Sequence, residues 1–149
     1  MNWEEKKSNL YYIDGSYRDI VVLDTTTKDW EEVISFLEQS ESYKVIFDST
    51  GTEDEKIDFN LVKSRWDSCY NNGKDNRLGI SVYVDTIRLN AHFFSDKEIE
   101  FDLDPKEIKS PSDDAKVMSF IESAARVLHK EVLITPENDH STTLLSTKG

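Results

Sequence analysis

Cysteine is nearly missing from the sequence, and its scarcity limits how the fold can be stabilised. Cys69 is the only cysteine among 149 residues, so the chain cannot form an internal disulfide. A single thiol is typical of a protein that folds in a reducing compartment. The three histidines, His92, His129 and His140, lack the i, i+4 spacing of a helical zinc site, and one cysteine cannot build a structural one. We therefore expect no metal site and no cofactor.

Long apolar runs and phosphate-binding glycine motifs are also missing. No stretch approaches the roughly eighteen apolar residues that a membrane span requires. The first nine residues, MNWEEKKSN, lack the apolar core of a signal peptide. The glycines are isolated, and none belongs to a GxxxxGK[ST] or GxGxxG motif. The sequence predicts a soluble, cytoplasmic protein without a nucleotide-binding loop.

Basic residues are few relative to acidic ones. Eighteen lysines and arginines stand against thirty aspartates and glutamates, which gives a formal charge of −12. This charge disfavours nucleic acid as a partner, because such proteins bind by neutralising phosphates. It favours a basic protein partner, since complementary charge accelerates encounter. Solubility alone is the other explanation of the charge, and both stay open.

The chain does contain enough apolar material for one domain. Hydrophobic residues make up 37% of the sequence and aromatic residues 11%. A globule of this length buries roughly 70% of the surface of its unfolded chain, so it needs no disulfide or metal to fold. We expect a single domain over residues 1–137. Residues 138–149 are polar and are expected to form a flexible C-terminal tail.

Hydrophobic periodicity predicts an α+β fold. Two short β-rich runs, 10–13 and 20–23, flank Asp14-Gly15-Ser16 and predict an N-terminal hairpin. Apolar residues at helical spacing predict helices over about 26–39, 59–71 and 111–129. Alternating residues predict strands over 43–47 and 132–135 and a meander over 78–103, whose short connections require antiparallel neighbours. We expect about three helices packed on one mainly antiparallel sheet, with an exposed charged loop at 52–58.

Nucleophilic catalysis finds little support in the sequence. Cys69 and a histidine such as His92 could form a nucleophile–base pair. Cys69, however, shares the apolar face of its predicted helix with Trp66 and Tyr70, where a free cysteine usually behaves as a small hydrophobe. We predict that the protein is not an enzyme. A deep pocket joining Cys69 to His92, or a carboxylate pair shielded from water, would revive the enzyme hypothesis.

Two groups of carboxylates are the main candidates for a binding site. Glu98, Glu100 and Asp102 alternate with apolar residues on one face of a predicted strand, and Glu53, Asp54 and Glu55 crowd the predicted loop. One interpretation is a solvated surface that protects the sheet from edge-to-edge association. The other is a docking surface for lysines and arginines of a partner. We take these six residues as candidate partner-binding residues.

Two segments resemble a set of small, acidic bacterial proteins. They are an EIEFD strand at 98–102 and a K-x-V-x-[IL]-T-P-E-N segment at 130–138, within a resemblance that is most specific over residues 79–138. Some of those proteins resemble immunity proteins encoded beside polymorphic or contact-dependent growth-inhibition toxins. The resemblance implies a cytoplasmic antidote that occludes the active site or substrate groove of a toxin domain, for example a basic nuclease. An interaction module with a non-toxin partner is the alternative.

Overall fold

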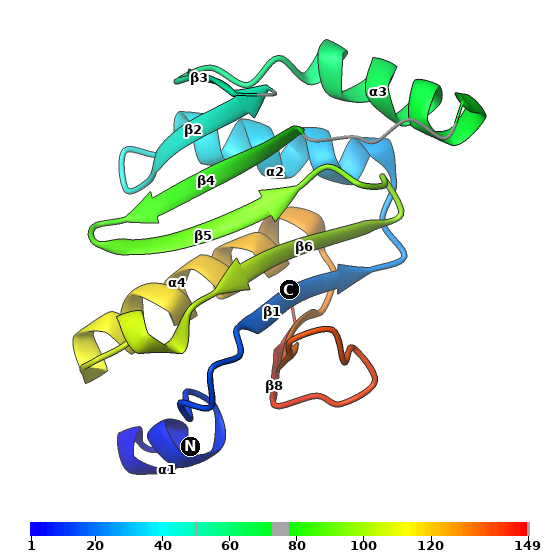
Figure 1. Ribbon diagram of the computed structural model, residues 1–149. Coiled ribbons are helices and arrows are strands. Elements are labelled where there is room, and N and C mark those ends of the chain that lie inside the picture. The colour runs from blue at the N-terminus through cyan, green and yellow to red at the C-terminus, as the bar shows by residue number, and fades with distance from the viewer. Residues whose placement is uncertain (50, 73–77, 149) are drawn as a thin grey trace.

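The computed structural model describes residues 1–49, 51–72 and 78–148. Within these residues, eight strands form a single antiparallel sheet (Figure 1). The side chains of residues 68–72 lie outside this description. The sheet order is β3-β2-β4-β5-β6-β1-β7-β8, and together with the helices it confirms the predicted α+β class. The strands are β1 (Arg18–Leu23), β2 (Lys44–Ser49), β3 (Thr52–Asp54), β4 (Leu78–Val84), β5 (Ile87–His92), β6 (Glu98–Leu103), β7 (Val132–Pro136) and β8 (Leu145–Thr147). The helices are α1 (Trp3–Asn9), α2 (Thr27–Gln39), α3 (Phe59–Asn72) and α4 (Pro111–Leu128), with a 3-10 turn η1 at Pro105–Glu107.

Helices α2 and α4 lie behind the sheet in the view of Figure 1 and cover one of its faces. Alternation along β4, β5 and β6 sends most of their apolar residues to this face; on β6 these are Ile99, Phe101 and Leu103. Phe120 of α4 packs on Phe101 and Trp30 of α2 packs on Phe93, and both are almost completely buried. No helix among the described residues covers the opposite face of β4, β5 and β6, which carries the polar residues of these strands.

The three predicted helices begin where their capping residues stand. Thr26 and Asp29 form a capping box at the start of α2, in which each side chain accepts from the backbone amide of the other. Ser110 caps α4, with Pro111 at its first position. His129 ends α4 in the left-handed region, at a φ of 54°. The predicted Asn72-Gly73 stop of α3 falls partly on residue 73, outside the described residues.

The predicted N-terminal hairpin is wrong. Residues 3–9 form α1, whose first turn is capped by the Asn2 side chain, and residues 10–13 form no strand. The backbone carbonyls of Leu10 and Tyr12 instead accept hydrogen bonds from the guanidinium of Arg18, which is completely buried. Strand β1 pairs with β6 and β7, so it lies inside the sheet.

Two further segments differ from expectation. The charged loop at 52–58 contains the short edge strand β3, paired with β2. The expected C-terminal tail contains β8, which pairs with β7 over Leu145–Thr147. Leu144 and Leu145 pack against the core, and the Leu144 amide donates to the carbonyl of Ile134. These two leucines explain why the segment returns to the sheet despite its polar neighbours.

Candidate functional site

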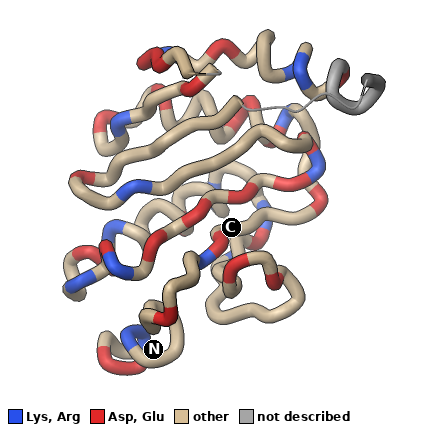
Figure 2. Tube along the Cα trace, viewed as in Figure 1, with Lys and Arg blue, Asp and Glu red and all other residues tan. Residues whose placement is uncertain are grey.

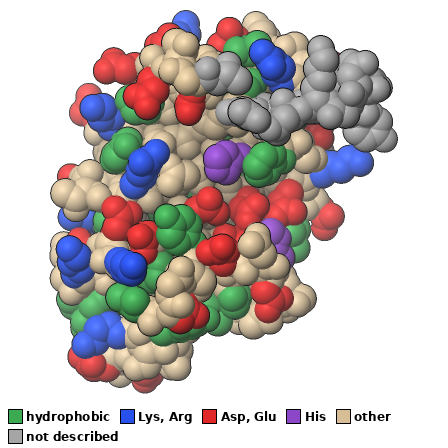
Figure 3. All heavy atoms as spheres, in the orientation of Figure 1, with side chains coloured by type: hydrophobic (Ala, Val, Ile, Leu, Met, Phe, Trp, Pro, Cys, Tyr) green, Lys and Arg blue, Asp and Glu red, His purple; other side chains and the backbone are tan. Residues whose placement is uncertain are grey.

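Acidic side chains gather on the open face of the sheet. Glu98, Glu100 and Asp102 of β6 point away from the helices and are partly exposed. Asp19 of β1 lies directly opposite Asp102 in the β1–β6 register. Figure 2 shows acidic positions along β6, and Figure 3 shows acidic side chains in a band across this face. We call Asp19, Glu98, Glu100 and Asp102 the acidic band.

His140 reaches the acidic band from the loop between β7 and β8. Its Nε2 lies 3.0 Å from Oδ2 of Asp19 and 3.1 Å from Oε1 of Glu100. Its Nδ1 lies 2.9 Å from Oε1 of Glu98. Because Asp19 belongs to β1 and the two glutamates to β6, the imidazole bridges two neighbouring strands. The loop that carries it is therefore folded back onto the open face.

Asp19 is the most deeply buried member of the acidic band, with an exposed fraction of 1%. Its Oδ2 accepts a hydrogen bond of 2.8 Å from the backbone amide of Asn138, in addition to the contact with His140. Asn138 takes a φ of 60°, a left-handed conformation that asparagine tolerates better than most residues. Oδ1 of Asp19 is buried and has no hydrogen-bond partner among the described residues.

Crowding and burial shift the protonation of the acidic band. Burial, followed by the neighbouring Asp19 carboxylate, raises the pKa of Glu100 to about 7. The same two causes raise the pKa of Asp102 to about 6. Burial opposes the charged form of His140, but the hydrogen bond to Asp19 and the charges of Glu98 and Glu100 outweigh it and raise the pKa of the imidazole. The cluster therefore retains protons at a pH at which isolated carboxylates have lost theirs.

A shallow hollow of 270 Å³ adjoins the acidic band over β4 and β5. Asp102 and His92 line it, together with Gly79, where a Cβ atom would lie 2.9 Å from the backbone oxygen of Ala91. His92 stacks on Phe94, with ring centroids 5.2 Å apart, and Phe94 is 64% exposed. The open face therefore combines carboxylates with an exposed aromatic pair.

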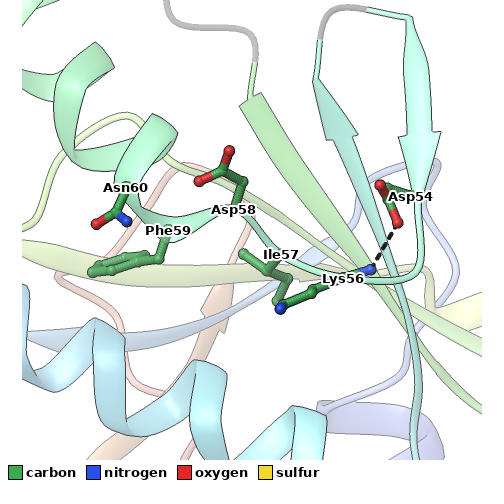
Figure 4. A pocket seen from close by; sticks show the side chains of 6 residues that line it. All are labelled: Asp54, Lys56, Ile57, Asp58, Phe59 and Asn60. Carbon is green, nitrogen blue, oxygen red and sulfur yellow. Dashed lines mark hydrogen bonds between the residues drawn. The ribbon is translucent and has the colours of Figure 1, made fainter.

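The second group of predicted partner-binding carboxylates lies away from the acidic band. Glu53 and Asp54 belong to β3 and Glu55 follows it, and all three are exposed. Strand β3 is four strands from β6, a separation of roughly 19 Å at the usual strand spacing. Figure 4 shows a hollow beside this group, of 460 Å³, where the Asp54 carboxylate accepts from the Lys56 backbone amide at 3.1 Å. The structure therefore brings Glu98, Glu100 and Asp102 together but separates them from Glu53, Asp54 and Glu55.

Two members of the cluster were not predicted as site residues. Asp19 precedes a run of apolar residues in β1, and only the pairing of β1 with β6 brings it to the acidic band. His140 was assigned to a flexible tail, although Asn138 and the leucines at 144 and 145 are signals of a turn and a return to the core. The Cys69–His92 pair is untested, because the Cys69 side chain lies outside the described residues. Asp19 and Asp102 do form a carboxylate pair that is partly shielded from water, but only the open hollow of 270 Å³ adjoins it.

Among the described helices, none is long and apolar enough to cross a membrane. Comparison of the chain with protein-family models, with curated proteins and with solved structures finds no match.

Proposed function

We propose that the protein is a non-enzymatic, cytoplasmic immunity protein that binds a basic toxin domain through the open face of its sheet. The observation that carries the proposal is the acidic band, which α2 and α4 leave uncovered and which lies beside an exposed aromatic pair. The resemblance of residues 79–138 to small, acidic bacterial proteins, some of which resemble immunity proteins, supports the same partner class.

The charge of the acidic band favours a cationic partner. Among the described residues, no lysine or arginine forms an ion pair with Asp19, Glu98, Glu100 or Asp102, and His140 contacts three of these four carboxylates. Charge-assisted hydrogen bonds from arginine or lysine to carboxylates are roughly twice as strong as neutral ones. A basic partner would replace the protons held by the crowded carboxylates, and the overall charge of −12 would steer it to the surface.

Exposed apolar side chains at the margins of the acidic band supply the other component of a protein interface. Phe94 is 64% exposed, and Tyr17 and Leu23 are each 42% exposed. Leu23 pairs with Glu98 in the β1–β6 register, and Tyr17 lines the hollow that Asp102 also lines. Aromatic residues are enriched at interfaces and often contribute most of the binding energy. We expect Phe94 to act as an anchor beside the carboxylates.

A nuclease toxin fits this surface well. A nuclease must attract phosphate groups, so its substrate groove is positively charged. An acidic face with an aromatic anchor can occupy that groove and exclude the nucleic acid. Inhibition then follows from occlusion and requires no chemistry from the inhibitor.

Co-expression with the protein encoded immediately upstream tests the proposal. We expect a stable complex on co-purification and restored growth of cells that produce the partner. The double variant Glu98→Lys, Glu100→Lys and the single variant Phe94→Ala should each weaken both effects. The matched control is Glu31→Lys with Glu122→Lys, on the exposed surfaces of α2 and α4.

Circular dichroism first establishes that each variant is folded, so that a weaker complex reports the interface and not unfolding. A tight complex that tolerates the β6 and Phe94 variants but not reversal of Glu53, Asp54 and Glu55 would move the interface to the β3 edge. If no complex forms and the cells are not protected, the immunity proposal fails.

A further inference from the structure

We infer that Asp19, Glu100 and His140 form a binding site for a divalent transition-metal ion, Zn²⁺ or Mn²⁺, on the open face of the sheet. One ligand atom from each of these residues lies within 4.8 Å of the others. The residues come from β1, β6 and the β7–β8 loop, so an ion at this point would join three segments that are distant in sequence.

Two of the three distances between the ligand atoms match those of a coordination shell, and the third lies within 4.8 Å. Ligands that bind a metal at about 2.0–2.2 Å lie about 3.0–3.5 Å from one another in tetrahedral or octahedral geometry. Nε2 of His140 lies 3.0 Å from Oδ2 of Asp19 and 3.1 Å from Oε1 of Glu100. Binding would therefore replace the imidazole proton by an ion between the three atoms and would require only small side-chain movements.

Glu98 orients the imidazole as carboxylates do in metal sites. Metal-bound histidines usually donate their other ring N–H to a carboxylate or carbonyl, which fixes the ring and the tautomer. Oε1 of Glu98 lies 2.9 Å from Nδ1 of His140 and can accept that hydrogen. When the ion displaces the proton from Nε2, the lone pair of this nitrogen is directed at the point between Asp19 and Glu100. Asn138 fixes Asp19 in a similar way, through its backbone amide.

The buried oxygen Oδ1 of Asp19 is a second observation that favours a cation at this point. It belongs to a residue that is 1% exposed and accepts from no described N–H or hydroxyl group, so only a proton held by Glu100 or Asp102 could satisfy it, and an ion would replace that proton. A buried acceptor without a partner costs about 1–3 kcal/mol, and more when it is charged. A metal ion would satisfy this oxygen directly or through a bound water. Asp102, directly opposite Asp19, could supply a further carboxylate oxygen.

The donor set selects the class of ion. Ca²⁺ and Mg²⁺ prefer shells made entirely of oxygen, whereas an imidazole nitrogen favours transition metals. Two carboxylates and one imidazole suit Zn²⁺ and Mn²⁺. The rival explanation is that His140, as an imidazolium, neutralises the carboxylates without any metal.

Calorimetric titration of the chelator-treated chain with Zn²⁺ and with Mn²⁺ distinguishes these explanations. We expect one ion per chain and proton release, measured as a dependence of the heat on the buffer. His140→Ala should lower the affinity by about 100-fold or more, and Glu98→Gln by about 10-fold through loss of orientation. The matched control is His92→Ala, since His92 lies on the same face but outside the cluster.

Two results would overturn the inference: the absence of saturable binding, or weak binding of several ions that Ca²⁺ reproduces and His140→Ala leaves unchanged. If His140→Ala does not fold, Glu100→Gln provides the second test. This variant is titrated with Co²⁺ in place of Zn²⁺, because the visible absorption of Co²⁺ reports its coordination shell. The titration uses the isolated chain, so its outcome is independent of whether a toxin binds.

Discussion

Arg18 is the residue on which the N-terminal segment depends most directly. Its side chain is completely buried, and its guanidinium donates to the carbonyl oxygens of Leu10, Tyr12, Ser16 and Tyr17 while stacking on the Tyr12 ring. A planar guanidinium with five donors can satisfy several carbonyls at once, whereas an ammonium group cannot match that geometry. The buried charge is thus compensated mainly by backbone dipoles.

We expect Arg18→Lys to destabilise the protein by about 2–4 kcal/mol, because the buried carbonyl of Leu10 and the partly buried carbonyls of Tyr12, Ser16 and Tyr17 lose their donors. Asp14→Ala should cost much less than this, since Asp14 is half exposed and lies 3.8 Å from the guanidinium. Urea denaturation of the two variants measures both values. Equal losses would show that the ion pair with Asp14, and not the set of carbonyls, compensates the charge.

The acidic band predicts how stability depends on pH. The pKa of Glu100 rises from 4.5 to about 7 and that of Asp102 from 3.8 to about 6, so between those values the folded state binds more protons than the unfolded state. The raised pKa of His140 acts in the same direction. Their contribution is complete below the unfolded pKa of each group and is lost as the pH rises through the folded value. Carboxylates with a lowered pKa, such as Asp29, act only at lower pH.

We therefore expect the chelator-treated protein to lose stability between about pH 5 and pH 8, by about 1–3 kcal/mol in total. Urea denaturation at several pH values measures this loss. The cluster that titrates faces Asp19, Glu98 and Glu137 as well as His92. Glu100→Gln should flatten the profile, because the amide cannot ionise. A profile that rises across this range would contradict the assignment of the raised pKa values.

At the scale of secondary structure, the sequence predicts those elements whose periodicity is long. Helices α2, α3 and α4 and the meander β4–β6 repeat their apolar pattern over many residues, and all were predicted close to their observed bounds. Residues 10–13 were mistaken for a strand because their run is short and β-rich. What decides their conformation is a contact with Arg18, which local propensity does not contain.

The candidate site, like the secondary structure, was predictable from the sequence only where it depends on a local pattern. Alternation in β6 predicts that Glu98, Glu100 and Asp102 share a face, since that follows from the period of two. The neighbours of this row could not be predicted, because they depend on strand order. Strand β1 joins β6 across a long sequence separation, and the chain beyond β7 folds back to bring His140 onto it.

The C-terminal segment is an element whose removal tests its role. Val21 lies on the open face of β1, where its strand neighbours are Glu100 and Leu133. It is nevertheless completely buried, so a neighbouring segment covers it. Deletion of residues 138–149 removes β8 and the contacts of Asn138 and His140 with Asp19. We expect it to destabilise the protein by about 2–4 kcal/mol, measured by thermal and urea unfolding. Deletion of residues 148 and 149 alone is the control and should change little.

For the whole molecule, the relevant property is how its charge is distributed relative to its layers. Helices α2 and α4 occupy one side of the sheet, and β6 presents its carboxylates on the other, so the negative field is strong on a surface that no described helix covers (Figures 1 and 2). Complementary charge acts mainly on the rate of association and is screened over about 8–10 Å at physiological salt. The position of a carboxylate on the molecule should therefore affect the association rate more than the net charge does.

Two variants of equal net charge separate these effects in the proposed complex with a basic toxin. Glu98→Gln with Asp102→Asn removes two charges from the acidic band, and Glu31→Gln with Glu122→Gln removes two from α2 and α4, so that each changes −12 to −10. We expect the first pair to slow association by about 10-fold at low salt and to weaken its salt dependence, and the second pair to change the rate by less than about 2-fold. Stopped-flow or surface-binding kinetics at several salt concentrations measure both. Equal effects of the two pairs would mean that net charge alone steers the partner, and the acidic band would then lose its assignment as the docking surface.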